Sequence, residues 1–239
     1  MGLLSPLLEI QDIDRTCDQL LIRRRELPER AQKAKVEARI ATIDAAHGEL
    51  VRKREGLDQA EHDMADHVGA VAARAKGVED TLYGGTVTAA KDLTVLQGEI
   101  GVIRAEQSQL EEQEMALLEE MEQAESEIAE NRRARAEIEG ELAEVDSQLK
   151  AAEGVIDGEI AELGRGKASH AEGLPDEVIA AYESLRRHER LNGIAAAALT
   201  EKGCGGCKMS LPRLEVARMR EKPEEALLHC ENCGRLLVR

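Results

Sequence analysis

The chain has 239 residues and a formal net charge of −16; a third of its residues are charged, and its aromatic residues are two Tyr, with no Phe or Trp. Aromatic side chains supply much of a compact core, so this composition argues against an ordinary globular fold and is typical of long helices or coiled coils. The acidity disfavours nucleic acid and anionic membranes as partners unless charge is segregated locally, and no apolar run approaches the roughly 18 residues that span a bilayer. The N-terminal sequence is too short and too soon acidic for a signal peptide, so a cytoplasmic location with reduced cysteines is expected.

The first helical arm shows apolar residues in steps of three and four, from Ile10 to Leu27 and again from Val36 to Leu82. The nine-residue step between these two runs does not fit the period, and it contains Pro28. Because proline lacks the backbone N–H that a helix interior needs, we expect a kink or break near Pro28.

The second arm carries an apolar seam from Leu93 to Ile156, which amounts to nine heptads and indicates a coiled coil. Between the arms, Gly84 and Gly85 break the helix, so we place the apex at about 83–92. Arms of similar length favour an antiparallel hairpin in which residue i lies near residue 170−i. A net charge of +5 over residues 15–54 and of −8 over the facing residues 116–155 supports this pairing. An intermolecular coiled coil is the main alternative to this pairing. A further alternative is that the two charged runs do not pair and are simply faces exposed to solvent.

The region after the second arm is rich in glycine, with Gly164, Gly166 and Gly173 ahead of Pro175. We interpret 164–174 as a linker. Pro175 followed by two acidic residues suits the first turn of a helix, and Asn192-Gly193 suits a C-cap. A short connecting helix is therefore predicted over 175–193.

The C-terminal segment contains two Cys-x-x-Cys pairs separated by 22 residues, and the four cysteines are Cys204, Cys207, Cys230 and Cys233. Each pair presents two thiolates from one tight turn, and two such turns complete the tetrahedral sulfur shell that Zn²⁺ prefers. A short helix over Arg213 to Arg220 would fill the interval. Four thiolates close the shell, so the predicted Zn²⁺ is single and structural, and its binding supplies much of the folding free energy of so small a tail.

Three other roles compete with zinc binding at these cysteines. A disulfide does not suit the cytosol, a thioredoxin-like pair needs only one motif, and an iron–sulfur cluster is an alternative to zinc. His229 adjoins Cys230 and is a substitute ligand in principle, but four cysteines already suffice. Cys17 occupies the helical seam, where a small buried apolar role is expected.

The predicted fold class is mainly α: a long antiparallel coiled-coil helical hairpin followed by a small C-terminal β zinc-ribbon domain. The hairpin is placed at 1–163, the linker at 164–174, the connecting helix at 175–193 and the C4 zinc ribbon at 194–239.

Three stretches of the chain resemble the bacterial coiled-coil hairpin proteins with a C-terminal C4-type zinc ribbon. The stretches are Leu82 to Ile100 at the apex, Tyr182 to Ala195 before the ribbon, and the cysteine pairs with Met209, Leu211-Pro212 and Gly234 to Leu237. The resemblance covers essentially the whole chain and departs from the family at Ala89-Ala90, where Asn-Pro is frequent. It implies that residues 193–200 form a strand, although their alanine run alone reads as helix. It also implies binding of nucleic acid, or an adaptor role for proteins that include transcription and secretion components.

Two functions follow as hypotheses. The first is a non-enzymatic adaptor or scaffold for protein partners, because the chain is mostly helical surface without a catalytic constellation. The second is nucleic-acid binding, or transcription-associated regulation, through the ribbon. Binding of RNA or DNA would be weak and salt-dependent, since the loaded ribbon is near neutral and lacks aromatic platforms. The candidate contacts for nucleic acid or a partner are Arg213, Arg218, Arg220 and Arg235. Catalysis is not expected, because no nucleophile is paired with a base and no open metal position is apparent.

Overall fold

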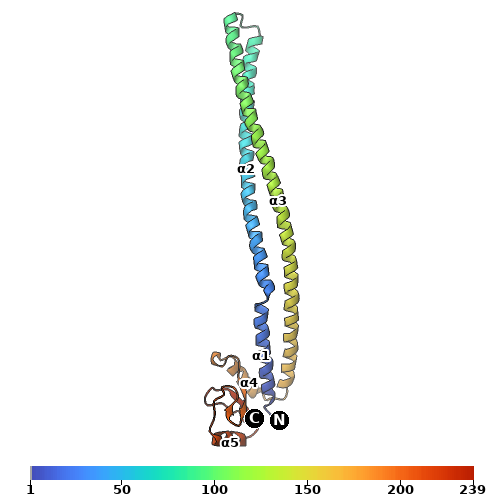
Figure 1. Ribbon diagram of the computed structural model, residues 1–239, viewed down its shortest axis with the longest axis vertical. Helices are drawn as coiled ribbons and strands as arrows, with labels where there is room; N and C mark the ends of the chain where they lie inside the picture. The colour runs from blue at the N-terminus through green and yellow to red at the C-terminus, as the bar shows by residue number, and fades with distance from the viewer. Residues whose placement is uncertain (1) are drawn as a thin grey trace. The chain divides into compact units, whose positions relative to one another are not determined.

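The computed structural model describes residues 2–239 (Figure 1). Its helices are α1 (Pro6–Arg25), α2 (Pro28–Tyr83), α3 (Ala90–Ala171), α4 (Asp176–Arg186), a 3₁₀ turn (Glu189–Leu191) and α5 (Arg213–Glu221). Its strands are β1 (Ala196–Thr200), β2 (Gly203–Cys204) and β3 (Leu236–Val238). The predicted class, mainly helical with a small C-terminal sheet, is confirmed.

By its internal contacts the chain forms two compact units. The base unit contains the residues up to Ala31 and those from Asp146 to Arg239, and the hairpin unit contains Gln32–Val145. The four-part division made from the sequence follows local pattern rather than contacts. Apart from the start of its linker, which is described below, it stays a prediction.

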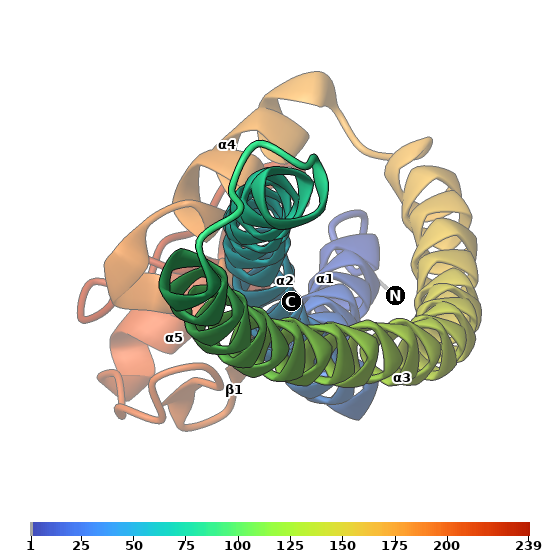
Figure 2. The same cartoon turned by 90° about the horizontal axis from the view of Figure 1, so that it is seen from above.

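In the hairpin unit, α2 and α3 run antiparallel, and Figure 2 looks down on the turn that joins them. Salt bridges connect the helices along their length, among them Arg39–Glu141, Arg54–Glu125 and Arg74–Glu106. Every buried apolar residue of this unit belongs to the two apolar seams seen in the sequence: Val36, Val71, Ala75, Leu82, Ile100, Ile103, Ala124, Ile138 and Val145. The apolar period therefore forms the interface between the two helices.

The register of the hairpin differs from the prediction. Residues Arg39, Arg54 and Arg74 pair with partners near residue 180−i rather than 170−i. The turn extends from the end of α2 at Tyr83 to the start of α3 at Ala90, so its centre lies beyond Gly85. This longer turn accounts for part of the shift.

The linker predicted at 164–174 is wrong over its first eight residues, because α3 continues to Ala171. The apolar period also continues, since Ile160 and Leu163 pack against the cluster of Leu20, Leu27, Leu149 and Ile156. A helical glycine costs about 1 kcal/mol relative to alanine, and this packing offsets that cost at Gly164 and Gly166. Glycine alone did not end the helix.

Near Pro28 the helix is interrupted, with α1 ending at Arg25 and α2 beginning at Pro28. The Glu26 N–H donates to the carbonyls of Ile22 and Arg23, which closes the last turn of α1. Pro28 then occupies the first position of α2, where its missing N–H costs nothing. The break places Leu27 in the cluster that packs on α3 within the base unit.

The sheet of the base unit has the order β2-β1-β3, with β1 antiparallel to β2 and parallel to β3. One face contributes Ala196, Leu236 and Val238 to a core shared with α1 and α4, where Leu7, Ile10 and Tyr182 are almost fully buried. The other face contributes Ala197, Leu199 and Leu237 to a core with α5 and the cysteine loops. A sheet covered on both faces reads as a continuous apolar run, and small residues let the layers approach closely. This double covering explains why an alanine run forms a strand here.

Candidate metal centre

Two similar loops present the four cysteines. In each loop the residue after the second cysteine has a left-handed backbone, with φ of 57° at Lys208 and 76° at Gly234. The N–H of Lys208 donates to the carbonyl of Cys204 at 3.0 Å, and that of Gly234 donates to the carbonyl of Cys230 at 2.7 Å. Each turn therefore folds back so that both thiols of a pair point the same way.

Two glycines allow the first loop to approach its neighbours. A Cβ at Gly203, where φ is 133°, would lie 2.6 Å from the Met209 carbonyl oxygen. A Cβ at Gly206 would lie 2.8 Å from Cδ of Arg235. Only glycine fits both positions without displacing the backbone or the Arg235 side chain.

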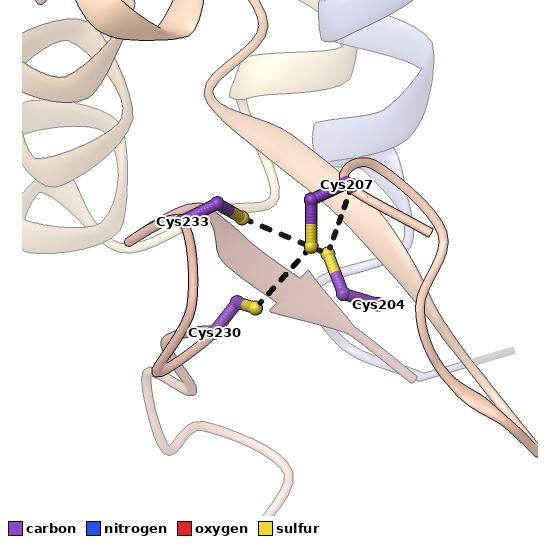
Figure 3. Close-up of side chains that lie close together, drawn as sticks. All are labelled: Cys204, Cys207, Cys230 and Cys233. Carbon is purple, nitrogen blue, oxygen red and sulfur yellow. Dashed lines mark hydrogen bonds between the residues drawn. The ribbon is translucent and has the colours of Figure 1, made fainter. Parts of the chain in front are cut away.

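The four sulfurs lie within 4.8 Å of one another and face a common point (Figure 3). Cys204 Sγ is 3.9 Å from Cys233 Sγ, and Cys207 Sγ is 3.8 Å from Cys230 Sγ. A tetrahedral zinc ion with Zn–S bonds of about 2.3 Å requires sulfur–sulfur edges of about 3.8 Å. Two of the six sulfur–sulfur distances therefore already match a zinc shell, and the other four are no longer than 4.8 Å.

The electrostatic surroundings of the thiols also favour a cation. Burial raises the pKa of Cys230 to about 12, so a thiolate at that position requires a compensating positive charge. Burial also raises the pKa of Cys233, but hydrogen bonds from the backbone and side chain of Arg235, together with those from the Cys230 and Cys207 thiols, outweigh it and lower that pKa to about 7. Arg235 thus supports one of the ligand thiolates.

Comparison with known families agrees with this geometry. The family model of the CT398-like coiled coil hairpin domain matches residues 10–190, and the family model of the C4-type zinc ribbon domain matches residues 204–237. The chain belongs to the CT398-like coiled-coil hairpin family. With the ribbon match and the sulfur spacing, the predicted cofactor, one structural Zn²⁺, is confirmed.

Relatives of this hairpin protein come from several bacteria. The uncharacterized proteins Rv2229c and MT2288 of two Mycobacterium tuberculosis strains are each 26% identical to it, over 98% of this chain and 94% of their own. A Mycobacterium smegmatis structure matches with a TM-score of 0.78 at 22% identity, covering all of both chains. CT398 from Chlamydia trachomatis matches with a TM-score of 0.68 at 19% identity, over 99% of this chain and 97% of that one. These structures support the fold.

The residues considered as substitute ligands lie outside the shell. His229 is exposed, and its Nδ1 is 3.2 Å from the Gly234 carbonyl oxygen. Cys17 is half-buried on α1. Among residues 2–239, the cluster suited to a metal contains Cys204, Cys207, Cys230 and Cys233 and neither of these two.

The four arginines proposed as contacts divide into two groups. Arg213, Arg218 and Arg220 lie exposed on α5. Arg235 is half-buried, and it donates from Nε to the Ile194 carbonyl at 2.9 Å and from a terminal nitrogen to the Leu191 carbonyl at 3.3 Å. Its guanidinium therefore holds the segment that enters β1, and the contact predicted for it stays without support.

A buried polar joint in the base unit escaped the sequence analysis. Asp14 of α1 is 5% exposed. It accepts a hydrogen bond from the Tyr182 hydroxyl at 2.7 Å and another from Lys167 Nζ at 3.0 Å, and it lies 3.3 Å from Arg186 Nε. One carboxylate thereby connects α1 with α3 and α4.

The cations of the joint have second partners. Lys167 pairs with Glu183 at 2.7 Å, and Arg186 pairs with Asp18 at 2.8 Å. One turn earlier on α1, the Gln11 side-chain oxygen accepts from the Ala195 N–H at 2.6 Å, and its nitrogen donates to the Gly193 carbonyl at 2.9 Å. Gln11 therefore anchors the segment that enters β1 to helix α1.

Within residues 2–239, none of the helices combines the length and the apolar character that a transmembrane span requires.

Proposed function

We propose that this protein is a non-enzymatic adaptor that binds protein partners through its coiled-coil hairpin and its zinc ribbon. The observation that carries the proposal is the cysteine centre. Its four thiols suffice to fill a tetrahedral shell, which would leave a bound zinc ion no position for a substrate or an activated water. The metal therefore supports a fold rather than a reaction.

The remaining chain supports the same conclusion. The two matched families are a coiled-coil hairpin and a zinc ribbon, which are structural domains. Large apolar side chains are exposed on both, including Val102 and Met115 on α3 and Leu214 on α5. Apolar residues that are exposed together on a rigid helix, as Met115 and Leu118 are one turn apart on α3, are suited to contact with other proteins.

Nucleic-acid binding by the ribbon has less support. Arg235 is engaged with backbone carbonyls, which leaves the three α5 arginines as candidate contacts. Both tyrosines lie outside the ribbon, so bases find no aromatic side chain on which to stack. We therefore propose that the three α5 arginines contact protein partners rather than nucleic acid.

Affinity capture with quantitative mass spectrometry tests the adaptor role. The baits are the full chain and its Cys230→Ser variant, and partners are accepted only when the reciprocal bait also recovers this protein. We expect two groups of partners, one lost with the ribbon variant and one retained through the hairpin.

Cys17→Ser is the matched control, because it removes a cysteine outside the zinc shell and should retain both groups. The proposal is wrong if no partner survives reciprocal capture, or if nuclease treatment removes every partner.

A further inference from the structure

The hairpin unit contains a stretch without positive side chains. It is bounded at one end by the Arg54–Glu125 pair and at the other by the Arg74–Glu106 pair. Between these pairs, residues 55–73 of α2 lie beside residues 107–124 of α3. Together they contain eleven Asp or Glu and no Lys or Arg. We call this stretch the acidic band.

The acidic band is not uniformly polar. Met115 is 63% exposed and Leu118 is 46% exposed on the outside of α3. Glu111 and Glu122, four residues from each along the helix, lie on the same face, because residues three and four apart are neighbours on a helix. The band therefore presents two apolar side chains framed by carboxylates.

The ribbon presents the opposite arrangement. A groove of about 720 Å³ runs along α5, and its lining contains three cations, Lys202, Arg213 and Arg220, and two carboxylates, Glu201 and Glu221. We call it the ribbon groove. The segment 202–222 that forms most of it holds six Lys or Arg and two Glu.

Two exposed apolar side chains lie outside the lining of the ribbon groove, each next in sequence to a lining residue, Ser210 or Arg213. Met209 in the loop before α5 is 55% exposed, and Leu214 on α5 is 66% exposed. Lys208 and Arg213 precede them in the sequence, and Arg218 follows Leu214 by one helical turn. This surface therefore presents two apolar side chains framed by cations.

We propose that the ribbon groove of one molecule binds the acidic band of a second copy of this chain. Opposite charges steer the two surfaces together and set their register, and the two apolar pairs meet at the centre, where water is excluded. A second copy is the occupant that the chain itself supplies, with complementary charge and matching apolar residues. The inference deepens the proposed adaptor role by naming one partner, and the adaptor role survives its failure because partner capture is measured separately.

Sedimentation velocity of the zinc-loaded full chain tests this inference. The expected result is a mass that grows with protein concentration in ~0.01 M salt, where charges act over about 30 Å, and a monomer in ~1 M salt, where they act over about 3 Å. Arg213→Glu with Arg220→Glu reverses the groove, and Glu119→Lys with Glu122→Lys reverses the band. Each double variant alone should weaken self-association by at least ~10-fold, because like charges then meet.

Mixing the two double variants gives the sharper result. The groove of the first variant, now acidic, meets the band of the second variant, now basic. The unaltered basic groove of the second variant also meets the unaltered acidic band of the first. The mixture should therefore regain the wild-type association. Glu159→Lys with Glu162→Lys is the matched control, since it places the same exchange on α3 outside the band, at exposed positions, and should associate like the wild type. Zinc content, measured for every variant, verifies that the ribbon is folded.

A wild-type chain that stays monomeric at low salt overturns the inference, as does a mixture that fails to recover association. Retention of a single-stranded RNA oligomer that the groove reversal abolishes, without any self-association, would assign the ribbon groove to nucleic acid instead.

Discussion

The two units of this protein are stabilised in different ways. In the base unit, a small sheet is covered on both faces and a four-thiol centre joins two loops. In the hairpin unit, two helices share one narrow seam, and between Val36 and Val71 every residue of α2 is at least partly exposed. Long-range contacts therefore determine the base unit, whereas the hairpin unit is built from a repeated local pattern.

Ion pairs show the same contrast. Asp14 in the base unit has a side chain only 6% exposed and is contacted by two cations and a hydroxyl. Arg39 and Glu141 in the hairpin unit form a 2.5 Å contact, but their side chains are 53% and 49% exposed. Breaking a buried pair leaves an uncompensated charge, whereas an exposed pair exchanges its partner for water. The base unit should therefore be sensitive to single changes that the hairpin unit tolerates.

Loss of the metal should produce the largest difference between the units. Removal of zinc by a chelator, or Cys230→Ser, should unfold the ribbon, because structural zinc contributes roughly 10 kcal/mol or more to small domains of this kind. Hydrogen exchange measured by mass spectrometry should show loss of protection in β1, β3 and α5, with the amides of residues 40–130 unchanged. Cys17→Ser should leave all of these amides protected. Equal loss of protection in both units would contradict the comparison.

Asp14→Ala tests the buried joint. It leaves Lys167 and Arg186 without their shared carboxylate, and we expect a loss of about 3 kcal/mol of unfolding free energy in the base unit. Urea unfolding followed by tyrosine fluorescence in a Tyr83→Phe background reports this unit alone, because Tyr182 is then the remaining tyrosine and the chain has no tryptophan. Asp18→Ala is the control, since it removes a half-exposed partner of the same Arg186. A loss as large as that of Asp14→Ala would count against the joint.

Alkaline pH should also weaken the base unit selectively. Burial, assisted by the hydrogen bond to Asp14, raises the pKa of Tyr182. Desolvation lowers the pKa of Lys167, but hydrogen bonds to Glu183 and Asp14 outweigh it and raise that pKa. The folded unit therefore holds these protons more tightly than the unfolded chain, so their contribution is complete below about pH 10 and declines as the pH rises further.

In the Tyr83→Phe background, ultraviolet absorbance should show tyrosinate forming at Tyr182 together with loss of the base fold, at a pH above that of free tyrosine. The additional variant Tyr182→Phe should flatten the alkaline loss of stability. If Tyr182 ionised at the same pH as free tyrosine while the base unit stayed folded, its hydroxyl would not be held by Asp14.

The same contrast explains which features the sequence predicted. The seam from Leu93 to Ile156 and the cysteine spacing are local patterns, so the hairpin, the ribbon and the metal ligands followed from them. Asp14 and Tyr182 lie 168 positions apart, and a polar residue beside a helical seam carries no sign of so distant a partner. The end of α3 was misplaced because Gly164 and Gly166 were interpreted without the packing of Ile160 and Leu163 that keeps them helical. Similarly, the alanines of β1 form a strand because layers from elsewhere in the chain cover both faces.

The smallest expected effect lies in the hairpin unit. Arg39→Ala should cost about 0.2–1 kcal/mol of unfolding free energy, because the pair with Glu141 is exposed on both sides and water replaces the lost partner. Urea unfolding followed by circular dichroism measures this cost, and a double-mutant cycle with Glu141→Ala isolates the pair from the loss of each side chain.

Ile103→Ala in the same unit provides the scale: its side chain is fully buried, and its truncation should cost about 2–5 kcal/mol. The pairing energy should also fall in ~1 M salt, since both charges face solvent. A pairing energy comparable to the cost of Ile103→Ala, or one insensitive to salt, would mean that charges rather than the apolar seam hold the two helices together.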